Sequence, residues 1–208
     1  MPRPDDPSSL DDGLLRPGAT ELAEAERLVA DGLLRHVVAG VYAPLHLPDT
    51  AGLRSAAILL ALAGTISARR AVAPAGDPAA AVVGHATAAW LHSGGPPPGR
   101  IDIVIAPGST RLRSTVLRLH EHRLATEDVE HVGGVLVTNP VRTAADVART
   151  LSPATALRLL DGLGLGCALR PVDVLDQLER MPHGRGVARA RAVVHTWASA
   201  VASRPAGP

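Results

Sequence analysis

The chain has 208 residues, of which 46% are hydrophobic and 20% are charged. This is enough for one compact domain with a small appendage, and it argues against a chain that is disordered throughout. All 21 basic residues are Arg, which excludes chemistry that needs Lys: a P-loop, a pyridoxal Schiff base, a protein kinase and a literal PD-(D/E)xK nuclease. An aromatic content of 1% also counts against stacking-based binding of single-stranded nucleic acid.

The sequence carries no sign of secretion or membrane insertion. The stretch from Met1 to Asp12 holds acids and prolines instead of a basic segment followed by an apolar run. The longest apolar runs, such as Ala56–Ala63, are shorter than the roughly 20 residues that span a bilayer. Cys167 is the single cysteine, which excludes an intrachain disulfide and a cysteine-based zinc cluster. We therefore expect a soluble, cytoplasmic protein.

The formal net charge is +1, but the charges are unevenly distributed along the chain. Residues 1–34 hold eight acids and three Arg, and residues 124–179 hold eight acids and four Arg. Residues 35–123 hold nine Arg and four acids, and residues 180–208 hold five Arg and no acid. Two basic stretches of this kind are typical of nucleic-acid binding, and equally of an ordinary solvated surface.

The N-terminal part predicts a disordered stretch, a helix and a hairpin. Residues 1–18 are rich in Pro, Asp, Ser and Gly and indicate a disordered terminus. A helix fits Thr20–Asp31, with Gly32 as its stop signal. Two β-prone runs then flank Ala39-Gly40, which predicts a tight hairpin. A helix followed directly by a hairpin is typical of a winged helix, so residues 19–47 are predicted to be winged-helix-like.

Residues 51–201 indicate a larger α+β domain. Its middle mixes helix and strand signals, and its last third is helical. The alternating run Arg100–Ile105 is the strongest strand, and Arg113–Leu124 is predicted to pair with it in an antiparallel manner. Further elements are expected as helices at residues 51–63, 85–92, 140–149, 153–163, 171–180 and 186–201, and as strands at 80–83 and 135–138.

Local signals set the helix ends in the last third. Asn139-Pro140 and Ser152-Pro153 each combine an N-cap residue with a proline at the first helical position. Three glycines within residues 162–166 are expected to end the second of these helices. Residues 202–208 are expected to be a flexible tail. The predicted fold class is α+β, with a short, degenerate winged helix followed by a mixed β-sheet domain and C-terminal helices.

Several segments, taken in order, resemble a known family. Asp31–Tyr42 is similar to the "G-x-L-x-R-V-x-x-G-V-Y" end of a winged-helix domain, and Val83–His92 resembles "S-H-x-S-A-A-x-L-x-G". The most specific run is Val135–Ala148, VLVTNPVRTAADVA, which resembles "G-x-P-V-T-S-P-x-R-T-L-x-D-L-A". With Arg100–Ile105 and Leu119–Leu124 between them, these segments resemble the AbiEi antitoxin family of type IV toxin–antitoxin systems, in its high-GC bacterial branch.

The resemblance covers about residues 31–195. It implies a cytosolic DNA-binding repressor of its own operon that also neutralises a nucleotidyltransferase-like toxin. Many relatives in that branch carry an additional C-terminal endonuclease-like domain, and we expect this chain to lack it.

Basic residues in and after the winged segment are the candidate DNA contacts. A winged helix places its second helix in the major groove and its hairpin near the phosphates. The candidate reading helix is acidic, with Glu21, Glu24 and Glu26 against Arg27. This leaves open a segment that binds a protein and has lost DNA binding. The candidate DNA contacts are Arg35, His36, Arg54, Arg69, Arg70, Arg111 and Arg113.

The resemblance marks a second set of residues as a structural motif. Arg142 and Asp146 lie four apart on one helix and can pair, which is worth about 0.2–0.5 kcal/mol if the pair is exposed. We interpret the run that contains them as a joint between strand and helix, with contact to a toxin as the alternative. The motif residues are His85, His122, Arg123, Thr138, Arg142, Thr143 and Asp146.

No metal site or catalytic site is expected from the sequence. His120 and His122 share one face of a strand and Asp102 on the partner strand could assist them, but a third ligand with suitable spacing is not visible. No Ser lies in a G-x-S-x-G motif, and Cys167 has no adjacent His. We therefore expect a non-enzymatic protein without a cofactor, whose partners are double-stranded operator DNA and a cognate toxin. The alternatives are an orphan protein-interaction module of the same fold and a nuclease or other enzyme.

Overall fold

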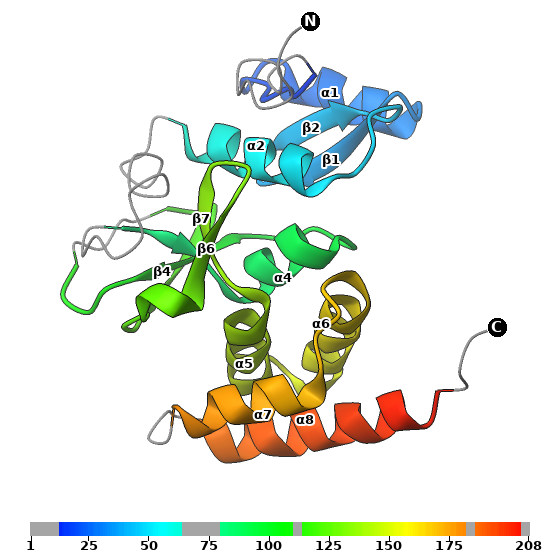
Figure 1. Cartoon of the computed structure of the whole chain (residues 1–208). Coiled ribbons are helices and arrows are strands. Elements are labelled where there is room, and N and C mark those ends of the chain that lie inside the picture. The colour runs from blue at the N-terminus through cyan, green and yellow to red at the C-terminus, as the bar shows by residue number, and fades with distance from the viewer. Residues whose placement is uncertain (1–12, 64–79, 110–113, 182–185, 205–208) are drawn as a thin grey trace, which may run out of the picture.

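The computed structural model of the chain has an α+β fold in three stacked parts (Figure 1). A unit of two helices and a hairpin lies on one side of a five-stranded sheet, and most of the remaining helices lie on the other side. The predicted class is confirmed. No helix in the described part of the chain is long and apolar enough to cross a membrane. The structure describes residues 13–63, 80–109, 114–181 and 186–204.

The first part, called here the N-terminal unit, covers residues 13–62. Helix α1 (Leu22–Ala30) precedes an antiparallel hairpin of β1 (Leu34–Val38) and β2 (Val41–Pro44). The two-residue turn Ala39-Gly40 has φ values of 47° and 78°, and a tight hairpin turn needs positive φ at both positions. The predicted hairpin is therefore confirmed, with its turn at the expected residues.

The stretch before α1 is ordered from Gly13 onward, so the prediction of a disordered terminus up to residue 18 is wrong for this part. Leu15 and Tyr42 exchange two backbone hydrogen bonds of 2.8 Å, which adds a short third strand segment to the hairpin. Leu14 is buried beside them in the hydrophobic core. Composition indicated a disordered terminus, but pairing with the edge of β2 satisfies the backbone groups of Leu15. Residues 1–12 lie outside the described residues.

Helix α2 (Ala51–Leu62) joins the N-terminal unit to the sheet. Thr50 caps it, because its Oγ1 accepts a hydrogen bond of 3.1 Å from the amide of Leu53. Ile58 is completely buried and belongs to one hydrophobic core with residues of the hairpin and of the sheet. Ser55 Oγ donates a hydrogen bond of 2.8 Å to the carbonyl of Val132. The N-terminal unit is thus continuous with the sheet through a shared core.

The sheet has the strand order β5-β4-β3-β7-β6. The pairs β3–β4 and β6–β7 are antiparallel, whereas β3–β7 and β4–β5 are parallel. The short 3-10 turn η2 (Thr126–Asp128) leads into its edge strand β6. The five strands are β3 (Val82–Val83), β4 (Ile101–Ile105), β5 (Leu117–Glu121), β6 (Val129–Val132) and β7 (Val135–Thr138).

The predicted antiparallel pairing of the two strands now called β4 and β5 is wrong. They run parallel, with Asp102 opposite Arg118 and Val104 opposite His120. A five-residue strand is about 17 Å long, and the eleven residues between Ile105 and Leu117 can extend about 36 Å, so the chain has room to return to the start of the strand. The sequence signal for two adjacent strands was correct, but their direction depends on this connection.

The described residues beyond the N-terminal unit form five helices, and four of them enclose a second hydrophobic core together with part of α4 (His85–Ser93). Gly164 does not end α6 as predicted. A Cβ at this position would lie 2.9 Å from Cζ2 of the buried Trp197, so the glycine allows close helix packing. The helices are α4 (His85–Ser93), α5 (Pro140–Thr150), α6 (Pro153–Gly166), α7 (Pro171–Glu179) and α8 (Val187–Ala202).

The N-caps predicted for α5 and α6 are confirmed. The side chain of Asn139 accepts a hydrogen bond of 2.8 Å from the amide of Arg142, and the side chain of Ser152 accepts one from Thr155. The flexible tail predicted from residue 202 does not hold for the described residues, because Arg204 forms an ion pair of 2.8 Å with Asp161. Residues 205–208 lie outside the described part.

Candidate functional site

Three histidines and two aspartates meet where the sheet contacts the helices, and we call them the histidine cluster. His120 belongs to β5, and His122 lies just after it. Asp102 comes from the neighbouring strand β4, and Asp146 from α5. His85 is the first residue of α4. Segments that are far apart in the sequence therefore converge on one place.

The backbone holds His85 in an unusual conformation. Its φ is 51°, in the left-handed region, where histidine is found more often than most residues but still at a cost. The preceding Gly84 lies against β4, and a Cβ at Gly84 would lie 2.6 Å from Cγ2 of Val104. This close approach fixes the start of α4, and with it the place where the buried His85 ring enters the cluster.

The hydrogen bonds of His85 define its tautomer. Its Nδ1 lies 3.1 Å from Oγ1 of Thr150, and that hydroxyl donates its own hydrogen to the carbonyl of Asp146 at 2.7 Å. The hydroxyl must therefore accept from Nδ1–H, which leaves a lone pair on Nε2. That Nε2 is buried and has no hydrogen-bond partner. Burial also lowers the pKa of His85 to about 4, so the ring is neutral at neutral pH.

His120 lies between Asp102 and the ring of His85. Its Nε2 lies 2.9 Å from Oδ1 of Asp102, which is almost completely buried within β4. The ring stacks on that of His85, with centroids 3.7 Å apart and planes inclined by 22°. His120 thus has a polar partner of its own and supports the position of the His85 ring.

His122 points toward Asp146 without forming a full hydrogen bond. Its Nε2 lies 3.7 Å from Oδ2 of Asp146, and this nitrogen is also buried without a partner. The His122 ring meets the edge of His85 with centroids 5.6 Å apart. One ligand atom from each of these three residues lies within 4.8 Å of the other two. The sequence indicated two histidines on a strand, and the structure adds His85 and Asp146 from two helices.

Arg142 connects the cluster to a buried ionic network. Its Nε donates to Oδ2 of Asp146 at 2.8 Å, and its Nη1 donates to Oδ2 of Asp128 at 2.6 Å. Gln177 Nε2 donates to the second oxygen of Asp128 at 2.9 Å. All four side chains are buried. The contribution of about 0.2–0.5 kcal/mol that was expected for an exposed pair of Arg142 and Asp146 does not apply to this buried pair. Removing one partner of a buried pair leaves an uncompensated charge.

The pKa of Asp146 reflects this environment. Burial by itself raises the pKa of a carboxyl group, but the His122 ring and the Arg142 guanidinium outweigh burial and hold the pKa of Asp146 well below its usual range. Arg149 Nη1 lies 3.3 Å from its second oxygen. Asp146 is therefore a carboxylate at any moderate pH.

Thr138 and Thr143 form the contact between β7 and α5. Thr143 Oγ1 donates to the carbonyl of Thr138 at 2.9 Å, and the two hydroxyl oxygens are 2.6 Å apart. His92 Nε2 lies 2.8 Å from the same carbonyl. These are the contacts that a joint between strand and helix requires, as interpreted from the sequence.

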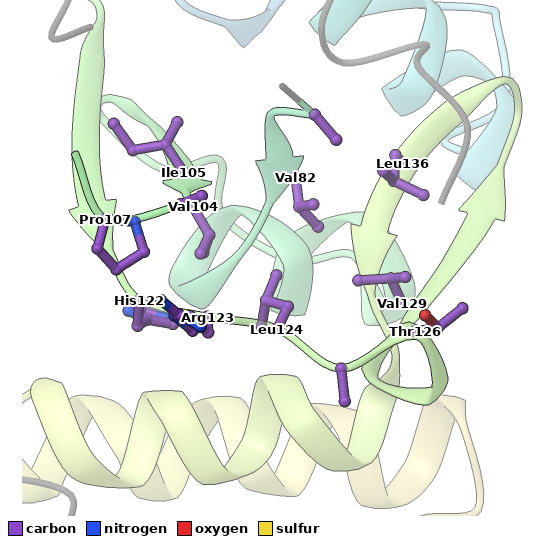
Figure 2. Close-up of a pocket in the computed structure, with 13 residues that line it drawn as sticks. Val82, Val104, Ile105, Pro107, His122, Arg123, Leu124, Thr126, Val129 and Leu136 are labelled. Atoms are coloured by element: carbon purple, nitrogen blue, oxygen red, sulfur yellow. The ribbon is translucent and has the colours of Figure 1, made fainter. Parts of the chain in front are cut away.

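Two pockets lie beside the cluster and share residues His122–Ala125 in their walls. One has a volume of about 440 Å³, and its apolar wall includes Val104 and Leu136. Figure 2 shows His122 and Arg123 on the wall of this pocket that faces the neighbouring helix. The second pocket has a volume of about 630 Å³ and is lined by several charged residues. Its arginines are Arg123, Arg142, Arg149 and Arg180.

The structure places the predicted DNA contacts differently from the sequence expectation. Arg54 is buried: its Nη1 donates to the carbonyl of Trp90 at 2.6 Å, and its Nε lies 3.1 Å from Asp49. The prediction that Arg54 contacts DNA is therefore wrong. Helix α2 is mainly apolar and packs into the core, and its Arg54 side chain is buried against α4. Arg35 is half-buried and donates to the carbonyl of Leu47.

The remaining predicted contacts are exposed or not described. His36 is exposed near the hairpin turn and meets the edge of the Tyr42 ring. Arg123, from the structural set, is exposed on the wall of both pockets. The other candidates, Arg69, Arg70, Arg111 and Arg113, lie outside the described residues.

Sequence reasoning missed three residues that complete the site. Asp128 and Gln177 are 49 positions apart and share no motif, so no spacing connects them. Thr150 lies four residues after Asp146 on α5, and that helical spacing could have indicated a shared face.

Comparisons with known proteins add little to this picture. No protein-family model and no curated protein matches the sequence. Among solved structures, the chain is similar to the crystal structure of the RV2827C protein from Mycobacterium tuberculosis, with 17% sequence identity and a TM-score of 0.41. The match covers 89% of this chain and 70% of that chain. At this level the similarity supports no conclusion about function.

Proposed function

We propose that this protein is a non-enzymatic regulator of the AbiEi-like antitoxin kind, and that its N-terminal unit contacts a protein partner. The ordered sequence motifs support the kind of protein that we propose. The surface of the N-terminal unit supports the proposed contact with a protein partner. The partner is the nucleotidyltransferase-like toxin that the resemblance implies.

The surface of the N-terminal unit carries this proposal. Leu33 is 59% exposed and Leu45 is 53% exposed, and they are neighbours because the amide of Leu45 donates to the carbonyl of Leu33 at 2.9 Å. Exposed apolar side chains that lie together are typical of protein contact surfaces. Leu15 and Leu22 are also about half exposed on the same unit.

The charges of the unit do not suit DNA. Helix α1 carries Arg27, but its guanidinium is held by Glu24 at 2.6 Å and by Asp31 at 3.1 Å. Glu26 accepts a hydrogen bond from the Tyr42 hydroxyl. An acidic helix repels phosphates and attracts a basic protein surface. A protein whose own function is to bind nucleotides and nucleic acid offers such a surface.

Rescue of growth tests the proposal. The toxin is taken as the nucleotidyltransferase-like protein encoded next to this one, and both are expressed together. We expect the wild-type protein to restore growth, and the double variant Leu33→Glu/Leu45→Glu to fail. Leu165→Glu is the matched control, because Leu165 is a 79% exposed leucine near the end of α6 and does not belong to the N-terminal unit. Equal rescue by the double variant, or the absence of such a neighbouring gene, contradicts the proposal.

Operator binding is the second candidate function, and the arginine-lined pocket favours it. Arg123 and Arg180 are exposed at this pocket, and Arg142 and Arg149 lie deeper in its wall. Arginine side chains that line a groove are typical phosphate contacts. This would place DNA beside the sheet and not on the winged segment.

A gel shift with promoter DNA at low salt separates the two candidates. If DNA binds at the pocket, Arg123→Glu/Arg180→Glu weakens a specific shift, whereas Leu33→Glu/Leu45→Glu leaves it unchanged. If the N-terminal unit binds only protein, the wild type gives no sequence-specific shift.

A further inference from the structure

We propose that His85, His122 and Asp146 form a binding site for one divalent transition-metal ion of the zinc class. The site would use Nε2 of each histidine and a carboxylate oxygen of Asp146. It goes beyond the proposed function, which involves no metal.

Two unpartnered nitrogen atoms are the first observation. In the described part of the chain, three buried side-chain nitrogen or oxygen atoms lack a hydrogen-bond partner, and two of them are Nε2 of His85 and Nε2 of His122. A buried polar atom without a partner is destabilising, so two of them in one place call for an explanation. A metal ion between them would satisfy both nitrogens at once.

The distances are close to those of a metal site. The ligand atoms of a tetrahedral zinc ion lie about 2.0–2.2 Å from the metal, which puts any two of them about 3.3–3.6 Å apart. Nε2 of His122 and Oδ2 of Asp146 are 3.7 Å apart, and each of the three residues has one nitrogen or oxygen ligand atom within 4.8 Å of those of the other two. For a bound ion, side-chain rotation would need to shorten the widest of these separations by about 1 Å. His122 is 28% exposed and has room for such a rotation.

The neighbouring residues orient the ligands as outer partners of metal sites do. The Thr150 hydroxyl accepts from Nδ1 of His85, which fixes the tautomer with Nε2 free for a metal. Arg142 and Arg149 hold the two oxygens of Asp146. Each carboxylate oxygen has two acceptor positions, so a hydrogen bond leaves one for a metal. The two guanidinium charges oppose a cation, and we therefore expect moderate affinity.

The ligand types select the class of metal. Two imidazoles and one carboxylate suit zinc and its transition-metal neighbours, whereas calcium and magnesium need oxygen ligands. Three protein ligands leave one tetrahedral position open. His122 also lines both pockets, so solvent reaches the His122 side of the site.

Calorimetric titration of ZnCl2 into the untagged, chelator-treated full-length protein tests the site. We expect one saturable equivalent of zinc. His122→Ala lowers the affinity at least about tenfold. His131→Ala is the matched control, because His131 is an exposed histidine on β6, and it leaves the affinity unchanged. Circular dichroism checks that His122→Ala is folded, which we expect because its ring is partly exposed.

Cobalt provides a second readout that does not depend on heat. Co²⁺ bound by these ligands gives visible absorption bands of a tetrahedral site, and zinc displaces them. We expect these bands in the wild type and in His131→Ala, but not in His122→Ala. The absence of a saturable zinc equivalent in the wild type overturns the proposal, as does equal zinc affinity of the wild type and folded His122→Ala.

Discussion

Arg142 on α5 and Asp128 in the turn before β6 form a buried ion pair of 2.6 Å, although 14 positions separate them in the sequence. The pair connects the sheet edge to the helical part, and Gln177 extends it to α7. Each carboxylate in this network accepts a hydrogen bond from a partner. The network therefore stabilises the fold only while every one of these partners is present.

Loss of the Arg142 side chain should strongly destabilise the protein. Arg142→Ala leaves Asp128 and Asp146 buried without their main partner, and breaking a buried pair costs about 3–5 kcal/mol. Urea denaturation measures the free energy of unfolding. Arg170→Ala is the control, because its ion pair with Asp173 is exposed to solvent and its loss should change little. Similar effects of the two substitutions would show that the network is not a stabilising feature.

Acid should destabilise the protein through His85. Its folded-state pKa of about 4 lies below the ordinary value of 6.5, so the unfolded chain binds a proton first. The free energy of unfolding therefore falls by at most about 3 kcal/mol as the pH drops from about 6.5 to about 4. Below about pH 4 this group lowers it no further. The groups facing the ring are Asp146, Asp102, His120 and His122.

Urea unfolding at a series of pH values checks this dependence. His85→Gln removes the titrating ring, so its stability should vary less with pH between 6.5 and 4 than that of the wild type. The same slope in both proteins would contradict the assignment of this pH dependence to His85.

Arg54 should act in stability and not in DNA binding. Arg54→Ala removes the buried guanidinium that donates to the carbonyls of Trp90 and Leu91 at 2.6 and 3.2 Å, and loss of a hydrogen bond to a charged group costs about 1.5–3 kcal/mol. We expect a lower midpoint in urea, and no difference between the folded variant and the wild type in a gel shift with promoter DNA. A folded variant with weaker DNA binding would restore Arg54 as a contact.

Gly164 should not tolerate a methyl group. A Cβ there would lie 2.9 Å from the fully buried Trp197, and overpacking of a core costs about 1–3 kcal/mol. Gly52→Ala in α2 is the control, because its Cβ would meet nothing closer than 3.7 Å and alanine favours helix. Thermal unfolding should show Gly164→Ala below the wild type and Gly52→Ala at or above it. The reverse order would mean that Gly164 does not serve close packing.

Local signals predicted most elements of this fold because they act over a few residues. Asn139 and Ser152 placed the starts of α5 and α6, and Ala39-Gly40 placed the hairpin turn. The direction of β5 was predicted wrongly, since it depends on the connection and not on its own pattern. An antiparallel β5 would reverse the order of His120 and His122 along β4.

The candidate site was only partly predictable for the same reason. The resemblance named His85, His122, Arg142 and Asp146 one by one, but their convergence requires the packing of α4 and α5 on the sheet. The burial of Arg54 likewise depends on tertiary contacts with α4, which the residues next to it in the sequence do not predict.

Direct binding tests the central claim that the N-terminal unit contacts a protein. Calorimetry measures the affinity of the purified chain for the nucleotidyltransferase-like protein encoded beside it. We predict a complex with one copy of each protein, weakened at least about tenfold by Leu33→Glu/Leu45→Glu and unchanged by Leu165→Glu, as expected when central apolar contacts are lost. No binding, or equal affinity of all three proteins, would contradict this account.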